Sequence, residues 1–167
     1  MIFLGLTVLV CWWYTAVVAR DFQRSRVYQW GALFTLPCLH QLSRLRSERS
    51  CVKIIERACS LYGVPSCPVV FKTPRHQKCA YYYPDGGYIS LPPHMMRADI
   101  AVHEAAHHIV NHLWPRSIDH GPVFVRVYMC LMHRLYGLEM SWLRASARAS
   151  GVRWAGVKYD APLSELK

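Results

Sequence analysis

The sequence predicts an α+β fold that combines a small three-stranded antiparallel sheet with several helices, one of which carries several histidines. Apolar residues recur at helical spacing over most of the chain, and short alternating runs bounded by turn residues lie between positions 68 and 91. A length of 167 residues fits one domain. Hydrophobic residues make up 53% of the chain and charged residues 18%, which excludes a protein that is disordered throughout.

The chain begins with an uncharged apolar segment at residues 2–19, IFLGLTVLVCWWYTAVVA. As a helix it would be about 27 Å long, close to the thickness of a bilayer core, so we expect a single transmembrane anchor. Arg20, Arg24 and Arg26 follow it, and the positive-inside rule then leaves the rest of the membrane-anchored protein in the cytoplasm. A cleaved signal peptide and an apolar helix docked on the domain are the alternatives.

The next part of the chain is predicted to be helical and then to change to strands. Apolar residues have helical spacing over positions 21–46, with a break at Pro37, and over positions 50–61. Three short strands are expected at residues 68–73, 79–83 and 87–91. The turn signal PDG joins the last two strands, so they should form a hairpin.

Three further helices complete the predicted domain. Each has an apolar stripe and is followed by Pro or Gly; they are expected at residues 95–114, 122–136 and 139–150. The predicted organisation is an apolar N-terminal helix at 1–19, one domain at 20–154 and an irregular tail at 155–167.

The charge balance and the cysteines limit the partners and the compartment. Twenty Lys and Arg against 10 Asp and Glu give a net charge of +10, which suits a nucleic acid or anionic lipid headgroups as partners. The scattered arginines are otherwise expected to form a solvated face. Seven cysteines without a C-x-x-C pair indicate neither a zinc ribbon nor a complete disulfide framework, which favours a reducing compartment.

The chemistry is concentrated at residues 103–107, which read HEAAH inside a predicted helix. Residues four apart lie on one helix face, so His103 and His107 can bind one metal ion, while Glu104 can reach a water beside it. His120 follows 13 residues after His107, in a turn that opens the next helix, and is the predicted third ligand. Three histidines leave the fourth position of Zn²⁺ open, as in catalytic zinc sites.

Other polar residues near this motif leave alternatives open. Glu139 is a rival third ligand, and Asp119 is a candidate to orient a ligand histidine through its second ring nitrogen. His108 and His112 are expected to be ordinary helix residues.

Several tyrosines are also candidates. Tyr128 or Tyr136 could offer a hydroxyl to an oxyanion, although the sequence places neither. The run at residues 81–83 is expected to pack within a strand rather than to stack on nucleic-acid bases.

The motif and its surroundings resemble the SprT-like, or Spartan-type, zinc metallopeptidases, which are sometimes grouped with the minigluzincins. The resemblance rests on HEAAH, the histidine 13 residues later and the HGPVF that this histidine begins. The segments RDFQRSRVY and HGPVFVRVYMCLMHRLYG are similar to a small family of uncharacterised metallohydrolases of actinobacteria and their phages. Over residues 20–153 the resemblance implies a three-stranded sheet on the HExxH helix, zinc on His103, His107 and His120, and Glu104 as general base.

The expected function is that of a zinc-dependent metallopeptidase acting on a protein or peptide substrate. Glu104 would take a proton from a zinc-activated water and pass it to the leaving amine. An extended peptide is expected to add to the edge of the sheet along residues 87–91. The alternative is a basic membrane- or DNA-associated binding protein, in which the zinc site is structural or catalytically secondary.

Overall fold

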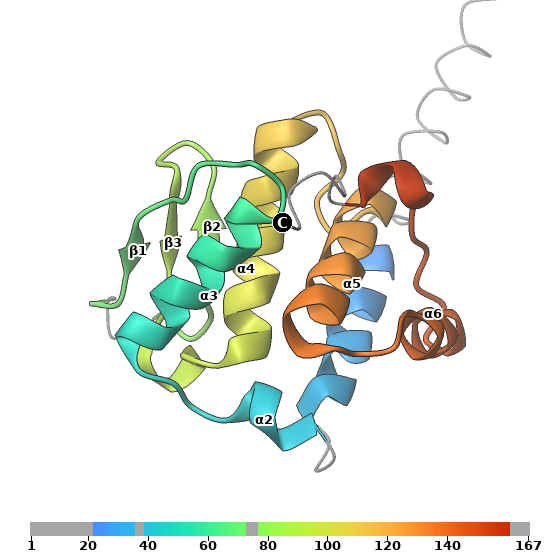
Figure 1. Cartoon of the computed structure of the whole chain (residues 1–167), viewed down its shortest axis with the longest axis horizontal. Helices are drawn as coiled ribbons and strands as arrows, with labels where there is room; N and C mark the ends of the chain where they lie inside the picture. Colours follow the sequence, from blue (N-terminus) through green and yellow to red (C-terminus); the bar gives the residue numbers. More distant parts are fainter. Residues whose placement is uncertain (1–21, 36–38, 73–76, 161–167) are drawn as a thin grey trace, which may run out of the picture.

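The computed structural model describes residues 22–35, 39–72 and 77–160, which form a helical body with a small sheet on one side (Figure 1). A first helix covers residues 22–31. The other α-helices are α2 (His40–Ser43), α3 (Glu48–Ser60), α4 (Ala98–Leu113), α5 (Pro122–Tyr136) and α6 (Met140–Ala149). The strands are β1 (Val69–Val70), β2 (Tyr81–Tyr83) and β3 (Tyr88–Ser90). Short 3₁₀ helices are η1 (Ala32–Thr35), η3 (Pro93–Met95) and η4 (Val157–Tyr159).

The sheet is mixed, so the prediction of a purely antiparallel sheet is wrong. Its strand order is β1-β3-β2; β3 pairs antiparallel with β2 and parallel with β1. The hairpin of β2 and β3 forms as predicted. The strands β1 and β2 do not form a second hairpin, because β1 lies on the far side of β3. The central strand is therefore β3, and β2 is at an edge.

The helices α4 and α5 lie in the middle of the fold, with α3 and the sheet on one side of α4 (Figure 1). Ala101, Ala105 and Ala106 on α4 are fully buried, because small side chains let the neighbouring helices approach closely. The two alanines of HEAAH therefore belong to the core. The helix begins at Ala98 rather than at residue 95, since Pro93 starts a separate 3₁₀ turn before it.

The first helix docks on the C-terminal part of the domain through its buried stripe. Trp30 is fully buried, and its Nε1 donates a hydrogen bond to Ser146 Oγ at 3.0 Å. Arg26 donates to the carbonyl oxygen of Gly151 at 3.0 Å, and Gln23 Nε2 donates to that of Arg153 at 3.0 Å. These contacts span more than a hundred residues and hold the helix in a defined orientation.

The segment after Trp154 packs against the domain as far as residue 160. The Arg126 guanidinium, which is buried in α5, donates two hydrogen bonds to the carboxylate of Asp160, the second at 2.6 Å. Tyr62 Oη donates to the carbonyl oxygen of Tyr159 at 3.2 Å. The first part of the predicted tail therefore contributes to the fold, although it forms only the short helix η4.

The membrane prediction needs a correction. Among the residues that the structure describes, no helix combines the length and the apolar character needed to cross a bilayer. The predicted anchor at residues 2–19 falls outside the described residues. The prediction of a membrane-anchored location with a single N-terminal span is wrong on this finding.

Candidate metal centre

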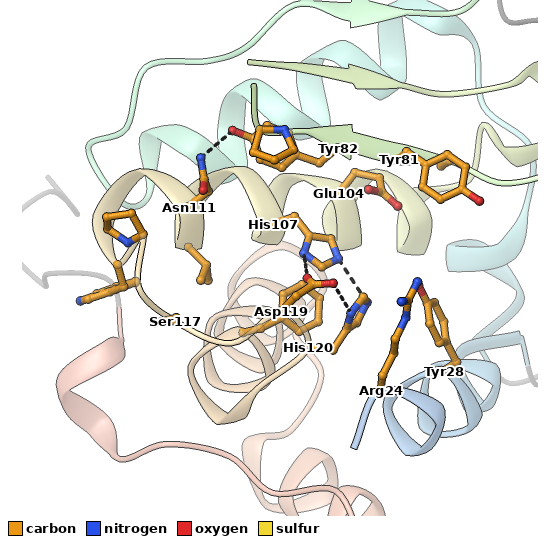
Figure 2. A pocket seen from close by; sticks show the side chains of 16 residues that line it. Arg24, Tyr28, Tyr81, Tyr82, Glu104, His107, Asn111, Ser117, Asp119 and His120 are labelled. Carbon is orange, nitrogen blue, oxygen red and sulfur yellow. Dashed lines mark hydrogen bonds and ion pairs between the residues drawn. The ribbon is translucent and has the colours of Figure 1, made fainter. Parts of the chain in front are cut away.

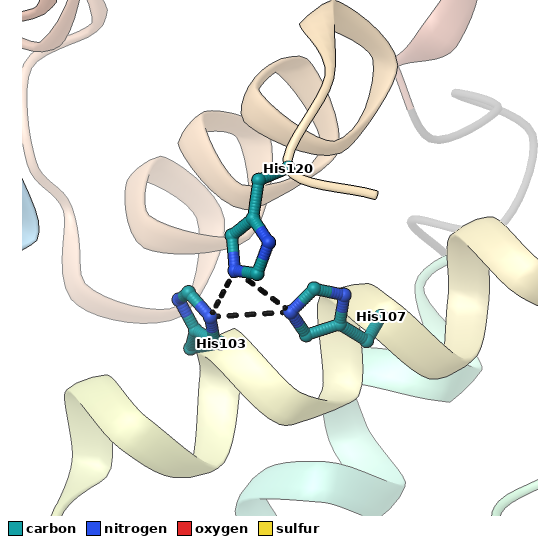
Figure 3. Close-up of side chains that lie close together, drawn as sticks. All are labelled: His103, His107 and His120. Carbon is teal, nitrogen blue, oxygen red and sulfur yellow. Dashed lines mark hydrogen bonds between the residues drawn. The ribbon is translucent and has the colours of Figure 1, made fainter. Parts of the chain in front are cut away.

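The structure brings together the three histidines that the sequence singles out. Their Nε2 atoms lie 3.1 Å apart for His103 and His120, 3.2 Å for His103 and His107, and 3.2 Å for His107 and His120 (Figure 3). Four nitrogen ligands at the usual Zn–N length of about 2.0–2.1 Å would be about 3.3 Å apart in a tetrahedron. The histidine triad, as we call these three residues, therefore has the dimensions of a metal site.

The helix α4 and the loop after it supply the three ligands. His103 and His107 are separated by one helical turn of α4, and the alanines between them face the core. His120 comes from the loop before α5 and is only 2% exposed. It has a φ of +53°, a left-handed backbone conformation that few non-glycine residues adopt and that is enriched at functional sites.

The residues after His120 explain the motif HGPVF. A Cβ on Gly121 would lie 2.7 Å from the carbonyl oxygen of Ile118, so a larger residue cannot fit without a shift of the loop. Pro122 occupies the first turn of α5, where its missing N–H costs nothing. The Phe124 ring is fully buried and stacks on the His107 imidazole at 4.3 Å between ring centres. These residues fix the direction from which His120 enters the triad.

Asp119 orients two of the ligands at once. Its Oδ1 lies 2.9 Å from Nδ1 of His107 and its Oδ2 lies 3.1 Å from Nδ1 of His120 (Figure 2). Burial acts to raise the pKa of this carboxyl, but the hydrogen bonds from both histidines hold the pKa well below its usual range. An ionised carboxylate only accepts hydrogen bonds, so both Nδ1 atoms carry the proton. This matches the orienting role considered for Asp119 from the sequence.

The position of the ring proton on His107 and His120 determines whether their Nε2 atoms can bind a metal ion. If Nδ1 of His107 and His120 is protonated, the Nε2 atoms of both rings carry lone pairs, and these face each other at 3.2 Å. A cation between them turns this repulsion into coordination. Burial and the neighbouring histidines lower the pKa values of His103 and His107, which keeps these imidazoles neutral, as metal ligands must be. The donor set therefore fits a metal ion.

Glu104 lies beside the triad without belonging to it. Its side chain is buried, with 6% of the residue exposed, and it lines the same cavity as His107 and His120 (Figure 2). Burial raises the pKa of Glu104 to about 8, against the opposing effect of a hydrogen bond from the Tyr82 backbone. A cation held by the triad would lower this pKa again and favour the carboxylate.

The remaining predicted candidates lie elsewhere. Glu139 occupies the N-cap position of α6, where its side chain makes no capping hydrogen bond, and it is not part of the triad. His108 is buried and its Nε2 lies 2.8 Å from the carbonyl oxygen of Pro65, a structural contact, while His112 is exposed. Tyr136 lines a separate cavity beside α3.

Tyr128 is close to the triad but engaged in the core. It is buried beside His103, with 5.5 Å between the ring centres, and its hydroxyl donates to the carbonyl oxygen of Asp99 at 3.4 Å. The hydroxyl of Tyr128 is thus committed to the backbone of α4.

Two cavities meet at Glu104. One, of about 320 Å³, extends from the triad toward the C-terminal end of α4 at Trp114. The other, of about 580 Å³, extends toward the N-terminal end of α4 at Ile100. Residues of three elements line both: Arg24, Tyr28, Ala80, Tyr81 and Glu104.

Sequence reasoning missed Arg24 and Tyr28, which it assigned to a solvated face or left unmentioned. The available signal was their spacing of four residues, which puts them on one helix face beside the stripe of buried positions Gln23, Val27 and Trp30. That spacing shows that the two residues share a helix face, but it does not show which part of the fold lies next to that face.

Comparison with models of known protein families, with curated proteins and with solved structures finds no match to this chain. What the protein does must therefore be inferred from the geometry of its own site.

Proposed function

We propose that this protein is a zinc-dependent metallopeptidase of the HExxH type. One observation carries the proposal: three histidine nitrogens, two of them with lone pairs directed by Asp119, converge beside a buried glutamate in an open cavity. Three protein ligands leave a coordination position for a substrate or water, whereas structural zinc sites use four. The resemblance to SprT-like metallopeptidases points to the same activity.

In this proposal Glu104 performs the proton transfers. Zinc, when bound, supplies a Lewis acid that polarises a carbonyl group and lowers the pKa of a water molecule toward about 7. The Glu104 carboxylate accepts a proton from the attacking water as the new bond to the carbonyl carbon forms. It then passes that proton to the amide nitrogen as the C–N bond breaks, which leaves a carboxylic acid and an amine.

The peptide substrate must lie elsewhere than the sequence predicted. Residues 87–91 cannot receive a peptide strand, because β3 pairs with β1 on one side and with β2 on the other. The edge strand β2 is the better candidate, since Ala80, Tyr81 and Tyr82 line the cavity at the triad. An extended peptide beside β2 would place its side chains in the two cavities that meet at Glu104.

The larger cavity suggests the class of side chain that is bound. It is lined by Val27, Met95 and Ile100 as well as by the residues that both cavities share. Apolar walls favour an apolar side chain next to the cleaved bond.

The experiment is hydrolysis of a mixed peptide library by the zinc-loaded full chain, read by mass spectrometry. Glu104→Gln should keep zinc and lose cleavage by at least about 100-fold, since the amide cannot accept the proton. Glu139→Gln, a matched change outside the site, should cleave at the wild-type rate. Cleavage by Glu104→Gln at the wild-type rate, or none by the zinc-loaded wild type, would refute the proposal.

A second candidate, a DNA-associated binding protein, has one observation in its favour. Arg46, Lys53 and Arg57 line a cavity of about 300 Å³ between α3 and the end of α5, and among the described residues no carboxylate lines it. Phosphate contacts would release counterions, so DNA affinity would fall steeply with salt. Titration of a DNA duplex at several salt concentrations, with Lys53→Gln as the variant, tests this role, which would survive in Glu104→Gln.

A further inference from the structure

The first helix presents a polar pair to the metal centre. Arg24 and Tyr28 are one helical turn apart, and both line both cavities at the triad. The Tyr28 ring lies 4.9 Å from the His120 ring and 5.8 Å from the His103 ring, measured between centres. In Figure 2 the two side chains extend from the first helix toward the cavity, across from Glu104.

The pair is held in place by the docked side chains of the same helix. Trp30 is fully buried, and Gln23 and Arg26 are hydrogen-bonded to the chain around residues 151–153. Tyr28 itself is 50% exposed, as expected for a side chain that borders an open cavity. A helix fixed on one face and open on the other is a rigid support for groups that meet a ligand.

The chemistry of the pair favours an anionic oxygen. The Arg24 guanidinium makes a side-chain hydrogen bond to Tyr28, and a guanidinium can only donate. The Tyr28 oxygen therefore accepts this bond, and its own hydroxyl proton remains as a donor directed elsewhere. A nearby positive charge strengthens such a donor toward an oxyanion.

We propose that Tyr28 is a catalytic residue that donates a hydrogen bond to the oxyanion of the tetrahedral intermediate, and that Arg24 is a positioning residue that holds its hydroxyl. The inference rests on the proposed peptidase function. When the water oxygen bonds to the carbonyl carbon, the carbonyl π electron pair moves onto the carbonyl oxygen. Tyr28 stabilises this negative charge from the side opposite Glu104, and the pair returns to the carbon as the C–N bond breaks.

The test separates transition-state binding from folding. The probe is a phosphinic dipeptide isostere of Phe-Leu, whose tetrahedral PO₂⁻ group mimics the intermediate, bound to the zinc-loaded full chain and measured by calorimetry. The parent Phe-Leu amide is measured alongside in the Glu104→Gln background, in which it should not be cleaved. Tyr28→Phe should weaken phosphinate binding by about 10- to 100-fold and change amide binding less than about twofold, because the hydrogen bond forms only to the oxyanion.

A double variant tests the role given to Arg24. Arg24→Gln should weaken phosphinate binding by a smaller factor, and Arg24→Gln combined with Tyr28→Phe should be no weaker than Tyr28→Phe alone. Tyr88→Phe is the control, because Tyr88 stacks on Tyr83 in the sheet and does not line either cavity. Zinc content must stay at the wild-type level in every variant.

Three results would overturn the inference. They are wild-type phosphinate affinity in Tyr28→Phe, equal losses for the phosphinate and the amide, and failure of the wild type to bind the phosphinate. The proposed function is judged separately by library cleavage in Glu104→Gln, so the role of Tyr28 can fail while the proposed function stands, and the two failures are distinguishable.

Discussion

Removal of the Asp119 carboxylate should weaken zinc binding far more than its exposed position suggests. The carboxylate accepts hydrogen bonds from His107 at 2.9 Å and from His120 at 3.1 Å. Loss of the partner of one ligand histidine typically costs about 10- to 100-fold in metal affinity. Because one carboxylate serves two ligands, we expect Asp119→Ala to raise the Kd for Zn²⁺ by at least about 100-fold, or about 2.8 kcal/mol.

Asp119→Asn provides a graded comparison. Its amide oxygen can accept a hydrogen bond from one histidine, while its NH₂ group faces the Nδ1 proton of the other, so we expect a loss of about tenfold. The Asp119 side chain is 46% exposed, so neither change opens a hole in the core, and the metal-free variants should unfold near the wild-type temperature.

Competition with a chromophoric chelator gives the Kd of each protein. Asp85→Asn, at an exposed turn away from the triad, is the control and should bind zinc like the wild type. If Asp119→Ala bound zinc within about twofold of the wild type, the carboxylate would not orient the ligands.

Three further predictions concern the loop, the tail and the thiols. Gly121→Ala should weaken Zn²⁺ binding at least about tenfold in the same competition, because its Cβ would meet a backbone oxygen at 2.7 Å; unchanged affinity would contradict this. Asp160→Ala should lower the free energy of unfolding in urea by about 2–3 kcal/mol, since the buried Arg126 loses its carboxylate; a loss below about 0.5 kcal/mol would contradict it. Burial raises the pKa of the Cys59 thiol to about 12, so iodoacetamide at pH 8 should label the exposed Cys79 and spare Cys59 in peptide mapping. The same shift should reduce stability as pH rises from about 9 toward 12, because the folded state holds the proton more tightly than the unfolded state.

The sequence predicted the bounds of a helix best where residues typical of helix ends mark both its first and its last turn. The helix α5 runs from Pro122 to Tyr136 as predicted, because a proline opens it and Gly137, with a φ of +69°, ends it. For α3 the prediction began two residues late, since Ser47 caps the helix and Glu48 is its first residue. The strands are shorter than predicted, because only part of each apolar run meets a neighbouring strand.

Long-range pairing could not be predicted in the same way. The parallel contact of β1 with β3 joins segments about 20 residues apart in the chain, and alternation within a strand says nothing about which strand lies beside it. That pairing also decides which strand has a free edge at the cavity. The predicted peptide position along 87–91 failed for this reason.

The same distinction between local and long-range contacts applies to the residues of the candidate site. The spacing of HEAAH brings His103 and His107 together through helix geometry alone, and Asp119 and His120 are neighbours in the chain. Tyr28 reaches the same site only because the first helix packs across the fold, and no local pattern contains that contact.

The metal content of the full chain tests the central claim of a three-histidine centre most directly. Elemental analysis should find about one zinc per chain in the wild type and in His112→Ala, which alters an exposed histidine on the same helix α4. His120→Ala should lose the zinc or bind it far more weakly, because two histidines on one helix remain. Absence of metal from the wild type, or a full zinc complement in His120→Ala, would contradict the account.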